Sequence, residues 1–96
     1  MEAVLDALGD ATRRHILERL AAGPTPVGEL AADLRTGRPG ISKHLKVLAG
    51  AGLVTHESVG TRNLYALALA ALVPLQQWLV GMWDSALTAF AEEMSE

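Results

Sequence analysis

The side chains most able to do chemistry in this 96-residue chain are cations gathered in its middle. Residues 35–62 hold five basic residues and one acidic residue, a local net charge of +4. Residues 68–96 carry four carboxylates and neither Lys nor Arg, and the whole chain has a net charge of −3. Such segregation is what a local phosphate-binding face on an acidic protein requires. A run of charges is also often only a solvated face. The spacing of the neighbouring apolar residues has to distinguish a solvated face from a phosphate-binding face.

Apolar spacing separates the inward side of residues 38–49 from the outward side. Ile41, Leu45 and Leu48 recur at helical intervals and predict a buried stripe. Arg38, at the start of this helix, is suited to donate two hydrogen bonds to guanine O6 and N7, and equally suited to hold a phosphate.

The outward side of this helix predicts contacts with double-stranded DNA. Ser42 and Lys43 are candidates for base edges, and Lys46 is a candidate for phosphate. Arg62 follows a turn glycine and is placed to enter a minor groove or touch its phosphates, the alternative being a solvated side chain. The predicted DNA-contacting residues are Arg38, Pro39, Ser42, Lys43, His44, Lys46, Thr61 and Arg62.

The histidines do not predict a metal site. His44 lies between the inward stripe and the outward side, so we expect a packed residue hydrogen-bonded to backbone or, second, a phosphate contact. His15 and His56 have no partner at metal-ligand spacing, and a zinc site would need distant segments to converge. The chain has no cysteine, which excludes disulfides, thiolate catalysis and thiolate ligation. We therefore predict no metal and no cofactor.

Enzyme motifs are missing from the sequence. It has no Gly-rich phosphate loop and no His-Glu-x-x-His stretch. Glu92 and Glu93 sit in a polar tail that solubility explains, and no convergent polar pocket is indicated. The residues predict a binding protein rather than an enzyme.

The sequence indicates neither export nor a membrane span. Glu2 and Asp6 lie in a first segment without a basic flank, unlike a signal peptide. The longest apolar run, residues 66–75, is too short to cross a bilayer and contains Pro74. We expect a cytoplasmic protein with one domain over residues 1–96.

The elements that position these residues are mainly helical. Two short helices joined by a tight turn form a helix-turn-helix unit, and Asp10 is expected to cap the helix before it. Two strands joined by Gly60-Thr61 follow as a hairpin, the wing. The predicted fold is a winged helix-turn-helix, mainly α with a small β-hairpin, of about five helices and a two-stranded wing. Helices are expected at residues 2–8, 11–22, 27–34, 38–49 and 73–94, and strands at 53–59 and 62–67.

The last helix has more apolar surface than one core can use. It packs either deeply on its own domain or with one side on a partner chain. A domain this small favours the partner, because it cannot cover both tryptophans. We therefore predict a homodimer. Its predicted interface residues are Val4, Leu5, Leu8, Leu79, Trp83, Leu87 and Phe90.

Several blocks of the sequence, in order, resemble the ArsR family of winged-helix repressors. The resemblance covers roughly residues 5–83, and ordered blocks are far more specific than a single motif. It implies a homodimer built largely on the first and last helices, with paired recognition helices that bind an operator. The blocks are DATRRHIL at 10–17, VGELA at 27–31, ISKHLKVL at 41–48, AGLV at 51–54 and the wing at 60–67 with Arg62 and Tyr65.

The chain departs from the metal-sensing branch of that family. That branch carries Cys-x-Cys in the helix that here begins Val27-Gly28-Glu29, and Asp and His pairs on the last helix, where this chain has no histidine. It is more similar to metal-independent members, which often repress their own operon. Gly37 also stands where relatives often have a better-capping Ser, and Arg38 changes the base that the helix start would prefer.

The sequence therefore predicts a sequence-specific DNA-binding transcriptional regulator. We expect a repressor that binds an inverted-repeat operator as a homodimer, its own operon being one candidate target. The alternative is a winged-helix protein-interaction module without DNA contacts, against which the basic outward side argues. The signal that relieves repression stays open among a small organic effector near the dimer helices, a second protein and control by abundance.

Overall fold

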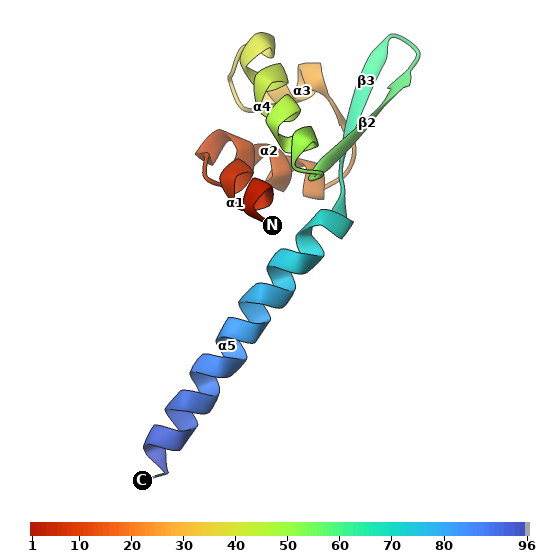
Figure 1. Ribbon diagram of the computed structural model, residues 1–96. Helices are drawn as coiled ribbons and strands as arrows, with labels where there is room; N and C mark the ends of the chain where they lie inside the picture. The colour runs from red at the N-terminus through yellow and green to blue at the C-terminus, as the bar shows by residue number, and fades with distance from the viewer. Residues whose placement is uncertain (96) are drawn as a thin grey trace.

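The structure is a computed structural model that describes residues 1–95, and it consists of a packed body and one projecting helix (Figure 1). The body comprises residues 1–72, and the helix extends the molecule to 64 Å along its longest axis, against 23 and 22 Å along the others. The elements in order are α1 (Glu2–Leu8), α2 (Ala11–Ala21), β1 (Thr25–Pro26), α3 (Val27–Asp33), α4 (Arg38–Gly50), β2 (Val54–Val59), β3 (Arg62–Leu67), the 3-10 helix η1 (Leu69–Leu72) and α5 (Val73–Met94).

The core of the body is formed by the inward stripes that the sequence predicts. Leu30 of α3 and Ile41, Leu45 and Leu48 of α4 are fully buried. The α2 stripe joins them, as do side chains of α1 and the start of β2. Burying aliphatic side chains from four helices in one cluster is the main favourable contribution to this fold.

The start of α2 has the cap that the sequence predicts. The Asp10 Oδ2 atom accepts a hydrogen bond from the Arg13 backbone N–H at 3.0 Å. This satisfies one of the amides that a helix leaves unpaired in its first turn.

The helix α3 ends at a residue in the left-handed conformation, and that residue is not glycine. Arg35 has φ 53°, a value that costs strain for a residue with a Cβ. The Thr36 N–H donates to the Ala31 carbonyl at 3.1 Å and the Arg35 N–H to the Ala32 carbonyl at 3.3 Å. This pair of bonds is a Schellman motif, and it directs the chain into α4, whose first turn contains Pro39 as predicted.

The wing is part of a three-stranded antiparallel sheet in the order β1-β3-β2. The predicted hairpin is confirmed, with Val59 opposite Arg62 and Gly60 in the turn at φ +64°. The two-stranded prediction is incomplete, because β1 pairs Thr25 with Tyr65. Two residues are too few to show strand alternation in a sequence, and one of them is Pro26, which a strand tolerates only at an edge.

The helix α5 leaves the body after η1 and has no buried residue along its length (Figure 1). Only its first turns touch the core, through Leu75 together with Leu72 of η1. Deep packing on its own domain, one of the two alternatives left by the sequence, is therefore wrong for the single chain. No helix within residues 1–95 combines the length and the apolar character needed to cross a membrane.

Candidate nucleic-acid interface

The outward side of α4 presents five of the predicted DNA-contacting residues to solvent. Because the inward stripe of α4 is buried, Ser42, Lys43 and Lys46 are exposed, as are Arg38 and Pro39 in the first turn. A helix with one face anchored in a core and a basic face outside has the form that enters a DNA major groove.

Sequence reasoning missed one residue of this surface. Val47 is 46% exposed although it is a large apolar side chain in the middle of a helix. It lies four residues after Lys43 and hence on the same side of α4. Its position outside the buried stripe was the available signal.

The start of α4 and the tip of the wing together form a shallow groove of about 200 Å³. Arg38 reaches it from α4, and Thr61 and Arg62 from the wing, so the structure brings together three predicted residues from two distant segments. A Cβ on Gly28 of α3 would lie 3.6 Å from Arg38 Nη2, so the guanidinium passes close over the α3 backbone. The groove is lined by Pro26, Val27, Gly28, Glu29, Arg38, Thr61, Arg62 and Asn63.

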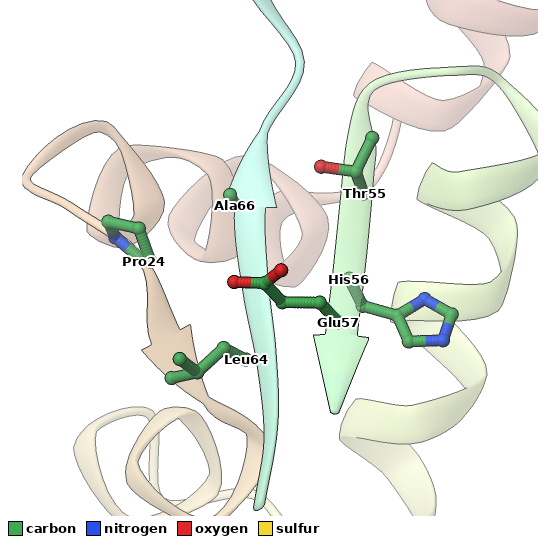
Figure 2. Close-up of a pocket in the computed structure, with 6 residues that line it drawn as sticks. All are labelled: Pro24, Thr55, His56, Glu57, Leu64 and Ala66. Atoms are coloured by element: carbon green, nitrogen blue, oxygen red, sulfur yellow. The ribbon is translucent and has the colours of Figure 1, made fainter. Parts of the chain in front are cut away.

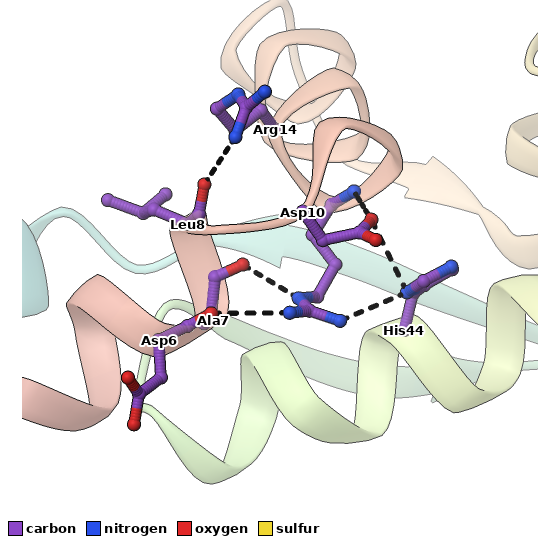
Figure 3. A network of polar contacts seen from close by, with 7 residues as sticks. Asp6, Ala7, Leu8, Asp10, Arg14 and His44 are labelled. Carbon is purple, nitrogen blue, oxygen red and sulfur yellow. Dashed lines mark hydrogen bonds and ion pairs between the residues drawn. The ribbon is translucent and has the colours of Figure 1, made fainter.

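His44 faces the body rather than the outward side of α4 (Figure 3). Its Nδ1 atom lies 3.5 Å from Arg13 Nη1 and 3.9 Å from Asp10 Oδ2. The expectation of a packed histidine agrees with its half-buried position, but the backbone partner was wrong, because the contacts are with side chains of α2 and its cap. The hydrogen bond from the Arg13 backbone N–H lowers the pKa of the Asp10 carboxyl, and the nearby positive charge of the Arg13 guanidinium acts in the same direction.

Comparison with known proteins finds a matching family model and relatives that are transcriptional regulators. A family model described as a helix-turn-helix domain matches residues 8–57. A transcriptional regulator of Mycobacterium tuberculosis, Rv2034, is 51% identical over 86 residues, which cover 90% of this chain and 80% of that protein. The transcriptional repressor SdpR of Bacillus subtilis is 31% identical over 80 residues, covering 83% of this chain and 89% of the relative.

Solved structures give the same result. The crystal structure of the ArsR family transcriptional regulator RHA00566 matches with a TM-score of 0.79 at 29% identity, over 86% of this chain and 91% of that one. This chain belongs to the ArsR family. A solution structure from Mycobacterium bovis, described as a homodimeric winged helix-turn-helix DNA-binding domain, matches with a TM-score of 0.71 at 29% identity, over 90% and 80% of the two chains.

Membership of the ArsR family confirms the predicted fold class and the predicted class of function. The chain is a winged helix-turn-helix transcriptional regulator, and the interaction-module alternative is not favoured, because its relatives are named regulators and repressors. The predicted family resemblance is likewise confirmed.

The remaining histidines of this ArsR-family chain lie apart. His15 is exposed on α2, and His56 of β2 stacks on Tyr65 with ring centroids 5.1 Å apart. Figure 2 shows a hollow on the wing where Glu57 extends across β3 while His56 points to the opposite side, toward α4. Neighbouring strand residues alternate in direction, so this carboxylate and imidazole do not converge. Within residues 1–95, no three His, Cys, Asp or Glu side chains are grouped to hold a metal ion.

The predicted dimer residues fall into three classes by exposure. Leu79, Trp83, Leu87 and Phe90 are exposed on α5, and Leu5 and Leu8 of α1 are half-buried. Val4 is only 6% exposed, because it turns into the core of its own body. Its place in the interface stays a prediction that its burial in a single chain does not favour, whereas the α5 residues are exposed in that chain.

Proposed function

We propose that this chain is a repressor that binds an inverted-repeat operator as a homodimer. The observation that carries the proposal is the basic outward side of α4 together with the groove at the wing, which unites Arg38 and Arg62. A recognition helix and a wing placed in this way span a major groove and the adjacent backbone.

The exposed face of α5 supports the homodimer. Monomeric proteins rarely expose continuous apolar patches of this kind, and covering such a patch with a second copy closes the surface. The neighbour from Mycobacterium bovis is described as homodimeric. Residues 1–96 then act as one unit, with helices at both ends available for dimerisation. Two symmetric recognition helices require half-sites about 10 bp apart, or a multiple of that spacing.

The residues of the DNA-binding face divide by chemistry. Arg38, Ser42 and Lys43 are proposed to contact bases, and the exposed methyl groups of Val47 suit a thymine methyl. Lys46 and Arg62 are proposed to supply charge to phosphates. Pro39 and Thr61 flank these contacts at the helix start and the wing tip.

Repression is supported by the name of a relative, the transcriptional repressor SdpR. Control of its own operon is the target to test first, with a reporter fused to the adjacent promoter. Because operator DNA in bacteria lies in the cytoplasm, we place the protein there, and we assign it no catalytic role, metal or cofactor. The inducing signal stays open, a small effector being one of the candidates.

Selection of binding sites from random duplex DNA tests the proposal. The selected site should be an inverted repeat. On that site, Arg38→Ala and Lys43→Ala should each lose about 5- to 150-fold in discrimination against a single base change, since a base contact is worth about 1–3 kcal/mol. Lys46→Ala and Arg62→Ala should weaken all sequences alike and lower the salt slope by about 1 per contact.

Glu18→Gln is the matched charge control. It changes the net charge by one unit, in the direction opposite to the face variants, at an exposed position of α2. It should leave the salt slope unchanged. If all four face variants bind like the parent, the basic face is not the DNA face and the repressor proposal fails.

A further inference from the structure

The Arg13 side chain connects three helices of the body. Its Nε donates to the Ala7 carbonyl at 2.7 Å and its Nη2 to the Asp6 carbonyl at 3.2 Å, both in the last turn of α1. Its Nη1 lies 3.5 Å from Nδ1 of His44 on α4 (Figure 3). One guanidinium on α2 thus holds the carboxyl end of α1, where unpaired carbonyls carry partial negative charge, and reaches the recognition helix.

Arg14 provides a contrast on the same helix. Its Nη1 donates to the Leu8 carbonyl at 2.7 Å and so also ties α2 to α1 (Figure 3). It makes no hydrogen bond or ion pair with α4 among the described residues. The two neighbouring arginines therefore share the α1 attachment and differ in the contact with His44.

The contact favours one tautomer of His44. A guanidinium has five N–H donors, no acceptor and a permanent charge, so a hydrogen bond across this 3.5 Å contact requires the lone pair to be on Nδ1. The proton of the neutral ring is then on Nε2. A second proton on Nδ1 would face the Arg13 charge, with Asp10 Oδ2 at 3.9 Å as the compensating group.

We propose that His44 and Arg13 are positioning residues that set the rotation of α4 about its axis relative to α1. The proposal rests on the function of α4 proposed above. His44 lies next to Lys43 in sequence and two residues before Lys46, so a small rotation of the helix at His44 displaces both. His44 therefore acts on DNA through Nδ1 and the Arg13 contact and does not itself touch DNA, which replaces its predicted role as a DNA contact.

The variants His44→Asn and His44→Gln distinguish a positioning contact through Nδ1 from a direct DNA contact through Nε2. An Asn side-chain amide occupies the position of Nδ1, whereas a Gln amide reaches the position of Nε2. We expect His44→Asn to keep discrimination between operator and point-mutated operator within about threefold of the parent. His44→Gln and Arg13→Met should each lose about tenfold, with the salt slope unchanged because no phosphate contact is lost.

The double variant tests whether the two residues act as one unit. Arg13→Met combined with His44→Gln should be no worse than either alone, because coupled residues are not additive. Arg14→Met is the matched control, since it removes an α1 attachment without touching His44, and it should keep the parent's discrimination. Circular dichroism and sedimentation on each variant confirm an unchanged fold and mass.

Two results would overturn the proposal. In the first, His44→Gln binds like the parent while His44→Asn fails and lowers the salt slope by about 1, which identifies a phosphate contact through Nε2. In the second, all His44 variants discriminate like the parent.

A measurement without DNA separates this proposal from the repressor proposal. Imidazole ¹⁵N shifts of the full chain at neutral pH should show His44 with its proton on Nε2, and Arg13→Met should shift that tautomer balance toward a mixture. A mixture already present in the parent overturns the positioning contact whatever the protein binds. The expected tautomer combined with no DNA binding leaves the contact standing and removes the repressor.

Discussion

In α4, Leu45 and Leu48 are at most 1% exposed, whereas in α5 Trp83 and Phe90 are 65% and 61% exposed. Both helices are rich in large apolar residues. The helix α4 is covered on its inward side by α1, α2, α3 and β2, so its stripe closes within one chain. The helix α5 meets the body only at its first turns and continues alone (Figure 1).

The regions around the two helices also differ in charge. The outward side of α4 and the wing carry the cations, while residues 68–96 carry four carboxylates and no Lys or Arg. A polyanion such as DNA is attracted to the first region and repelled by the second. The body thus has a closed apolar core and exposed cations that suit DNA. The helix α5 instead has an exposed apolar face and no cation.

The largest effect should come from truncating the exposed stripe of α5. The parent chain should sediment at about 20 kDa, twice its mass of 10.2 kDa. Trp83→Ala should raise the dimer dissociation constant by at least about 100-fold, because losing a buried aromatic costs about 3–5 kcal/mol and tenfold is about 1.4 kcal/mol. Gln77→Ala, an exposed polar position on the same helix, is the control. Equal dissociation constants for the two variants would show that this stripe of α5 is not covered by a partner.

A core truncation in the body should act on folding and not on association. Leu48→Ala should lower the free energy of unfolding by about 2–5 kcal/mol, measured by denaturant titration at fixed protein concentration. The mass of the native protein should not change. Val47→Ala is the neighbouring control, since Val47 is exposed and its loss should leave stability near that of the parent. Equal losses for both would contradict the division of α4 into an inward and an outward side.

The turn that precedes α4 should tolerate, and gain from, a glycine. Arg35→Gly should stabilise the body by about 1 kcal/mol, because Gly adopts φ 53° without steric cost. Arg35→Ala keeps the Cβ and removes the charge, so it separates strain from electrostatics and should not stabilise. Thermal unfolding of the three proteins compares them directly. A destabilised Gly variant would mean that the Arg35 side chain itself contributes to the turn.

The smallest effect should come from acid titration of the α2 cap. The pKa of Asp10 is lowered in the folded chain, so its stabilising effect is complete above the ordinary value of 3.8 and is lost as pH falls through the lower folded value. Asp10→Asn caps without titrating, so its thermal midpoint should fall less steeply than the parent's below about pH 4. Asp10→Ser, another non-titrating cap, should match it. If the thermal midpoints of both variants fall with acid as steeply as the parent's, titration of Asp10 is not the cause of the parent's loss of stability.

Much of the fold could be predicted from the sequence because its signals are local. The bounds of α1, β3 and α5, the Asp10 cap and the stripe at Ile41 follow from spacing and capping rules that operate within a few residues. The strand β1 was not predicted, because two residues are too few to show the alternation of a strand. The roles of Arg13 and Val4 and the groove at Arg38 depend on how separate helices approach one another, which no local pattern records.

The helix α5 has 22 residues and no buried one, so in the proposed homodimer DNA binding depends on the concentration of the chain. When a second copy covers that helix, the DNA-competent species grows with the square of the chain's concentration, so occupancy of an operator rises over a narrow range of expression. Below that range, single copies display an uncovered apolar helix, which is open to proteases and chaperones.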